Sequence, residues 1–217
     1  MFTNLINTFV LAWQYTLSHA DEFILALREH LFLVTISMIV GILVCVPLGI
    51  WTARSKRIAT AALNTVNTLR VIPSLAILFL LIPYLGLSST SALIALIVLA
   101  LPPILINTDA AFRGISPAIL EAARGMGMKP QQILFQIEFP LAAPVILTGI
   151  RIAAVEVIAS ATLAAFVGSG GLGIYITRGF ALYDYSILFV GAVPVALLTL
   201  FSEGIISGAQ KLIQYPQ

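Results

Sequence analysis

Long apolar runs alternate with short polar segments along this chain. Five of the runs approach the roughly 20 consecutive apolar residues that cross a bilayer as a helix. They cover residues 31–51, 61–84, 91–108, 140–167 and 186–208. This pattern predicts an all-α, polytopic membrane protein with five transmembrane helices, surrounded by membrane lipids in the cell (inner) membrane.

The stretch before the first run has a different pattern. Its apolar side chains recur at helical spacing, as shown by Leu5, Ile6, Phe9, Val10, Trp13 and Leu17. We interpret residues 1–30 as an amphipathic segment that lies at the membrane interface. An ordinary helix packed on the bundle is the alternative. Residues 31–217 then form the transmembrane domain.

Composition supports the membrane prediction and excludes several functions. Only 9% of the 217 residues are charged, against roughly 25% in soluble domains. The net charge of +2 gives no basic footprint for nucleic acid. Cys45 is the single cysteine, so no disulfide framework can form within the chain. His19 and His30 lack ligand companions, and we interpret both as interfacial residues. We expect no catalytic residue, cofactor or metal site.

The distribution of basic residues predicts the orientation of the chain in the membrane. They gather in two loops and the tail, as Arg54, Lys56, Arg57, Arg113, Arg124, Lys129 and Lys211. Only Arg28 and Arg178 fall on the other side. Cytoplasmic loops carry an excess of lysine and arginine. We therefore expect an external N-terminus, a cytoplasmic C-terminus and a cytoplasmic loop over 109–139.

That loop contains a polar island, "EAARGMGMKPQQILFQIEFP", over 121–140. Ser116 can cap a helix that begins at Pro117, since serine suits the capping position and proline the first helical one. Gly125 and Gly127 should end this helix in a turn.

A second short helix follows the turn. Pro130 can start this helix and Pro140 can end it. The first helix is compact and carries small residues, which suits insertion into a groove of another protein. Its expected contact residues are Pro117, Leu120, Glu121, Ala122, Ala123, Arg124, Gly125, Met126 and Gly127.

The island resembles a pattern that marks the membrane subunits of ABC importers: E-A-A, three residues, G, nine residues, I-x-L-P. This chain reads Glu121-Ala122-Ala123, then Gly127, then Ile137, Phe139 and Pro140. Phe139 replaces the usual leucine. The resemblance implies a type I ABC importer permease fold, with this segment as the coupling helix that docks on a cytoplasmic ATP-binding subunit. No G-x-x-x-x-G-K-[ST] occurs in the chain, so ATP hydrolysis would belong to that subunit.

Further segments resemble one subgroup, the permeases for glycine betaine, carnitine and choline. They are "TLRVIPSLAILFLLIPYLGL", "ALPPILINTDAAFRGI", "PLAAPVILTGIR", "ATLAAFVGSGGLG" and "GAVPVALL". Methionine-type permeases are the competing subgroup, and a stand-alone secondary carrier or channel is a rival of another class. The resemblance implies a second permease subunit, identical or related, and an external substrate-binding protein.

Charged residues inside the predicted spans are candidates for the translocation path, because charge is costly in lipid. Glu156 could attract a quaternary ammonium cation, and a buried ion pair with Arg70 or Arg151 is the alternative. The residues that we assign to the path are Arg70, Pro73, Ser74, Asn107, Glu156 and Ser160.

Glycines, aromatic residues and prolines complete the candidates. "GSGGLG" lacks the strand and acidic partner of a dinucleotide site. We interpret it as a flexible turn near an outer gate, formed by Gly168, Gly170, Gly171 and Gly173, with a plain turn as the alternative. Aromatic faces that could bind a quaternary ammonium, or form an aromatic belt, are those of Trp51, Phe79, Tyr84, Phe166, Tyr175 and Tyr183. A proline in every span predicts bent helices.

Overall fold

The structure of the protein is a computed structural model that describes residues 2–213, with side chains from Ile6 onward. Leu5 of the predicted amphipathic face therefore lies outside the described side chains. Within 2–213 the chain is helical and contains no strand. The elements are α1 (Phe2–Ser18), α2 (Ala20–Arg54), α3 (Lys56–Val71), α4 (Ser74–Leu85), α5 (Ser89–Arg113), α6 (Pro117–Gly125), α7 (Pro130–Ile133), the π-helical turn η1 (Leu134–Glu138), α8 (Phe139–Ser160), the 3₁₀ segment η2 (Ala161–Val167), α9 (Gly173–Leu182) and α10 (Tyr185–Ile213).

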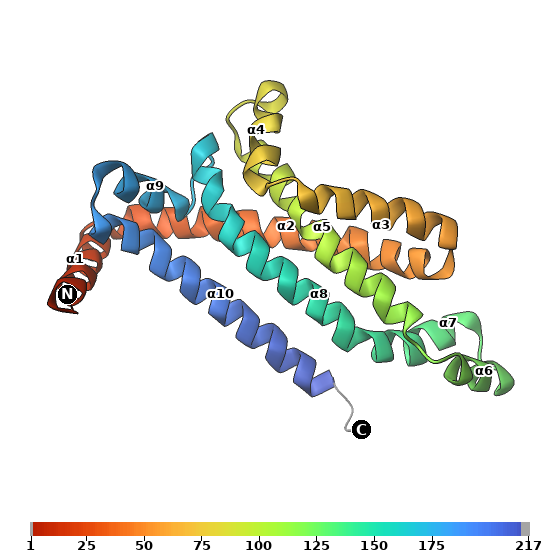
Figure 1. Cartoon of the computed structure of the whole chain (residues 1–217). Helices are drawn as coiled ribbons and strands as arrows, with labels where there is room; N and C mark the ends of the chain where they lie inside the picture. Colours follow the sequence, from red (N-terminus) through yellow and green to blue (C-terminus); the bar gives the residue numbers. More distant parts are fainter. Residues whose placement is uncertain (1, 214–217) are drawn as a thin grey trace.

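Three long helices, α2, α5 and α8, form the centre of an elongated bundle (Figure 1). Small residues allow their backbones to approach closely, as in other membrane helix pairs. A Cβ atom on Gly49 of α2 would come 2.6 Å from Thr108 of α5. A Cβ atom on Gly149 of α8 would come 2.6 Å from the carbonyl oxygen of Pro103. The core between these helices is therefore closed by backbone contact as well as by side chains.

Four apolar helices are long enough to cross a membrane, and a fifth crossing is broken in the middle. The predicted span 61–84 is wrong as a single helix, because α3 and α4 are separate and bent by 95°. Pro73 lies at the break. Proline has no N–H and pushes the residue before it out of the helical region, and Ile72 is indeed extended, with φ −78° and ψ 121°.

The other predicted bends do not interrupt their helices. The other prolines of the predicted spans lie within helices: Pro140 is in the first turn of α8, and the rest are inside continuous helices, namely Pro47, Pro83, Pro102, Pro103, Pro144 and Pro194. Within the five predicted spans, Pro73 is therefore the one proline that lies between two separate helices.

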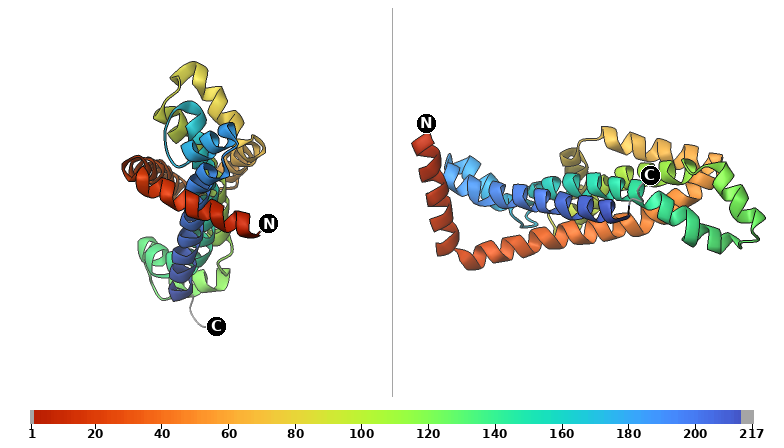
Figure 2. Two further views of the ribbon diagram at one scale, coloured as in Figure 1. Left: turned by 90° about the vertical axis from the view of Figure 1, so that its left-hand side faces the viewer. Right: turned by 90° about the horizontal axis from the view of Figure 1, so that it is seen from below.

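The N-terminal helix α1 lies across one end of the bundle (Figure 2). Ala12 is buried and the rings of Phe9 and Phe189 lie 4.9 Å apart, so one side of α1 packs on α10. Trp13 and Leu17 stay exposed. The predicted boundary at residue 30 falls within α2, which begins at Ala20. A position at the membrane interface remains a prediction for α1.

Candidate functional site

A short helical hairpin, α6 and α7, projects at the end of the bundle away from α1 (Figures 1 and 2). Helix α6 begins at Pro117 and ends at Gly125, as the sequence predicts. The predicted cap is wrong, because the Ser116 side chain makes no capping hydrogen bond; its carbonyl instead accepts one from the backbone N–H of Ile119. Gly127 has φ +77°, a conformation that glycine adopts without strain.

Most of the predicted contact residues on α6 face outward. Within this helix Ala123 is buried, and Leu120 is half-buried. Met126 is 72% exposed, so a flexible apolar side chain stands in the open. The other exposed members of the predicted set are Pro117, Glu121, Ala122, Arg124, Gly125 and Gly127. A short helix with this exposed face has the shape of a docking element.

The hairpin is joined directly to the membrane helices. Contrary to prediction, the second short helix does not extend from Pro130 to Pro140. It ends at Ile133, and the chain continues through η1 into α8. In this wider turn the N–H of Phe139 bonds to the carbonyl of Leu134, five residues back. A π turn changes the hydrogen-bond register next to Pro140, which has no N–H to give. An ion pair of 2.7 Å between Arg54 and Glu138 also ties η1 to the end of α2.

Arg113, the last residue of α5, holds the chain just before the hairpin. Its Nε donates to Asp109 at 2.8 Å, and its terminal NH₂ group donates to the carbonyl oxygen of Thr52 at 2.6 Å. The planar guanidinium can make both bonds at once, and its positive charge suits the C-terminal end of α2. The segments that lead into and out of the hairpin are therefore both attached to α2.

The break between α3 and α4 brings together most of the predicted path residues. Ser74, the first residue of α4, and Ser160, the last of α8, line one narrow crevice. Arg70, on the last turn of α3, acts electrostatically on Glu156 of α8. Asn107 lies elsewhere: its side-chain amide donates to the Pro103 carbonyl at 2.7 Å at the α5–α8 contact.

The predicted alternative for Glu156, a direct ion pair, is wrong for this chain. Across the described residues two ion pairs occur, Arg54–Glu138 and Arg113–Asp109, and neither includes Glu156. The carboxylate is half-buried. Glu156 therefore has no direct ion-pair partner among the described residues.

The predicted glycine turn lies at the opposite end of the molecule. Gly168, Gly170 and Gly171 have φ values of +69°, +79° and +84°. Gly173 instead begins α9, a short helix that the sequence did not reveal. Glu29 of α2 accepts a hydrogen bond of 2.9 Å from the N–H of Gly171. The turn is therefore held by a carboxylate from a distant part of the sequence.

Two neighbours of this turn differ from the sequence interpretation. His30 is not interfacial, since it is fully buried in α2 beneath Gly171. Tyr175 is only 2% exposed. The other aromatic candidates lie on the outside, where a belt would place them, namely Trp51, Phe79, Tyr84, Phe166 and Tyr183.

Membrane-length helices around a broken span, with a helical hairpin projecting from one end, define this chain as a polytopic membrane protein. Residues 45–212 match the family of binding-protein-dependent transport system inner membrane components. The chain belongs to this family, so the predicted ABC importer permease is confirmed.

Similar proteins cover most of the chain. It is 45% identical over 175 residues to the carnitine transport permease protein OpuCB of Listeria monocytogenes, covering 81% of this chain and 80% of that protein. It is 39% identical to the choline transport system permease protein OpuBB of Bacillus subtilis, covering 91% of each. An inward-facing structure of the MetNI methionine ABC transporter matches with a TM-score of 0.78 and 23% identity, covering 91% of this chain and 99% of that chain. This structural likeness establishes the type I importer permease fold.

Proposed function

We propose that this chain is the permease subunit of an ATP-driven importer for a small osmoprotectant, such as glycine betaine, choline or carnitine. The observation that carries this proposal is the 39–45% identity to choline and carnitine permeases over most of both chains. The methionine transporter, at 23% identity, supports the fold alone. A methionine or amino-acid substrate is the alternative.

ATP hydrolysis in this proposal belongs to two cytoplasmic subunits on which α6 docks. The exposed, apolar Met126 and the small Ala122 support this role. Basic residues outnumber acidic ones at the α6 end, which supports a cytoplasmic location. A second permease subunit would complete the path, and a substrate-binding protein would meet the glycine-turn end. A carrier or channel that works alone would leave the exposed face of α6 without a partner.

The translocation path in this proposal passes the α3–α4 break. Broken helices bind solutes in transporters because their free ends present unpaired backbone groups and partial charges. The N-terminus of α4 and Arg70 suit a carboxylate, and Glu156 suits an ammonium group. A zwitterion such as glycine betaine carries both groups.

The coupling role is tested by ATP-dependent uptake into proteoliposomes that hold the full complex. Ala122→Trp places a large side chain on the exposed face of α6, and it should abolish both uptake and stimulated ATPase activity. Ala196→Trp makes the same change on an exposed site of α10 and should keep both. Full activity of the α6 variant in assembled complexes would remove α6 from the coupling role.

The path is tested by Glu156→Gln, which removes the charge and keeps the shape. Uptake should fall while the complex still assembles and hydrolyses ATP. Glu203→Gln, on an exposed site of α10, is the matched control. Unchanged uptake in Glu156→Gln would move the path away from the helix break.

A further inference from the structure

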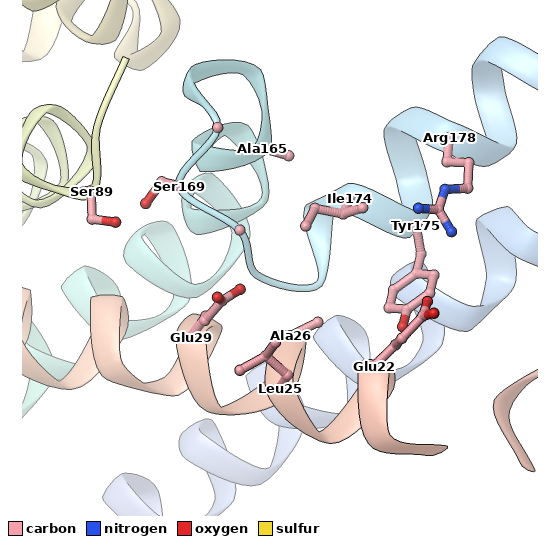
Figure 3. Close-up of a pocket in the computed structure, with 12 residues that line it drawn as sticks. Glu22, Leu25, Ala26, Glu29, Ser89, Ala165, Ser169, Ile174, Tyr175 and Arg178 are labelled. Carbon is pink, nitrogen blue, oxygen red and sulfur yellow. The ribbon is translucent and has the colours of Figure 1, made fainter. Parts of the chain in front are cut away.

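A hollow of about 410 Å³ lies at the glycine-turn end, between α2, the turn and α9 (Figure 3). Glu22 and Glu29 enter it from one face of α2. They are seven residues apart, so about 10 Å of helix separates them. Leu25 and Ala26 form an apolar floor between the two carboxylates. Arg178 of α9 stands on the other side.

The charged side chains of this hollow do not form ion pairs with one another. No ion pair links Arg178 to either glutamate in the part of the chain that the structure describes. The Arg178 guanidinium donates to the hydroxyl of Tyr15 at 3.3 Å. Glu29 accepts a hydrogen bond from Gly171 through one oxygen. Both signs of charge thus remain available to a bound molecule.

Ser169 adds a polar residue to the wall of the hollow. The residue lines the hollow and is 6% exposed, yet its hydroxyl has no hydrogen-bond partner among the described residues. Buried hydroxyls in folded proteins nearly always have a partner. The hydroxyl oxygen is itself shielded, so this unpaired group belongs to the wall of the hollow and does not contact a solute directly.

Tyr175 closes one end of the hollow. Burial, together with the nearby charge of Glu22, raises the pKa of Tyr175. A raised pKa keeps the phenol neutral at pH 7, so the anionic groups in the wall are the two glutamates. The wall therefore combines two anions, one cation and an apolar floor.

We propose that this hollow is a binding subsite for a small quaternary ammonium solute, separate from the α3–α4 break. The inference rests on the proposed osmoprotectant function. The methylated ammonium lies over Leu25 and Ala26, between Glu22 and Glu29, because such a cation is weakly hydrated and needs no hydrogen-bond acceptor. Arg178 receives the carboxylate of a zwitterion through its paired N–H groups.

Equilibrium binding to the full complex in nanodiscs, without binding protein and without ATP, tests the subsite. The probe is radiolabelled choline. Glu22→Gln keeps the side-chain shape and should weaken choline binding about tenfold, the effect of one lost interaction with a charged group. Asp21→Asn removes the neighbouring exposed acid, which does not line the hollow, and should leave binding unchanged. The uncharged isostere 3,3-dimethyl-1-butanol should not compete with choline.

Glycine betaine tests the role of Arg178. Arg178→Gln should weaken its binding about tenfold and leave choline binding unchanged, because choline has no carboxylate. Equal loss for both solutes would overturn this role. Absence of choline binding to the wild-type complex, or equal binding by wild type and Glu22→Gln, would overturn the subsite. Neither result would bear on ATP-dependent uptake, which tests the proposed function by itself.

Discussion

The two ends of this molecule each carry a glycine with positive φ in a turn, but the surroundings of the two glycines differ. At the α6 end, a Cβ atom on Gly127 would meet nothing within 4 Å. At the other end, a Cβ atom on Gly170 would collide with the carboxylate of Glu29. The first turn needs glycine for its backbone conformation alone. The second also places the Cβ position against the carboxylate of Glu29, which can move aside only by giving up its hydrogen bond to Gly171.

The two ends of the molecule also differ in charge. Acidic residues outnumber basic ones near the glycine turn, where the acids are Asp21, Glu22, Glu29 and Asp184 and the bases are Arg28 and Arg178. Basic residues prevail around α6. The acidic end suits the approach of a cation, and the basic end suits the cytoplasmic face. A turn that is open to partners and a turn held from within therefore face opposite sides in the proposed orientation.

The largest expected effect is that of Gly170→Ala. Alanine at positive φ costs about 1–2 kcal/mol, and displacing Glu29 also removes its hydrogen bond to Gly171, worth about 1.5–3 kcal/mol. The loss of stability should be about 3 kcal/mol. The thermal unfolding temperature of the purified permease would measure it.

Gly168→Ala is the control for this change. Gly168 also has positive φ, but a Cβ atom there meets nothing within 4 Å. Gly168→Ala should therefore lower stability only by the backbone strain, about 1 kcal/mol. Glu29→Ala alone should cost about 1.5–3 kcal/mol, but adding it to Gly170→Ala should cost little more, because the first change has already removed the hydrogen bond between Glu29 and Gly171. Equal unfolding temperatures for the two glycine variants would show that Glu29 does not constrain the turn.

The open turn was predictable from sequence because its signals are local. Pro117, Gly125, Gly127 and Pro130 mark the starts, end and turn of two short helices within 14 residues, and the structure confirms all four. The contact that holds the other turn was not predictable. Glu29 and Gly171 are 142 residues apart, and nothing near either residue in the sequence indicates the other.

The break between α3 and α4 shows a different limit of prediction from the sequence. A proline in every predicted span gave no means of choosing the one that separates two helices. The stretch before Pro73 contained the missing signal, because Asn64, Thr65, Asn67 and Thr68 make α3 far more polar than the other spans and are exposed in the structure. Polarity next to a proline, rather than proline alone, indicates such a break.

A smaller effect is expected at the open turn. Gly127→Ala should cost about 1 kcal/mol of backbone strain, which weakens docking of the ATP-binding subunit if the turn positions α6. Binding of that subunit to the solubilised permease would measure the change. Gly204→Ala replaces a helical glycine of α10 that has no neighbour within 4 Å and is outside the predicted docking set, and this variant should bind the ATP-binding subunit as well as wild type. Equal weakening by both variants would contradict a specific need at Gly127.

The smallest effect is expected at the ion pair that ties the hairpin to α2. The Arg54 side chain is 53% exposed and that of Glu138 is 14% exposed. Such a pair near the surface contributes about 0.5 kcal/mol, unlike the bond from Glu29 to the backbone of Gly171. Arg54→Gln should therefore lower the unfolding temperature slightly at low salt. The difference from wild type should vanish near 1 M salt, where the screening length is about 3 Å. Arg57→Gln, at a neighbouring exposed site without an ion pair in the described chain, should show no difference at either salt concentration. A difference for Arg54→Gln that persists in high salt would mean that the α6 end, too, is held by packing rather than by charge.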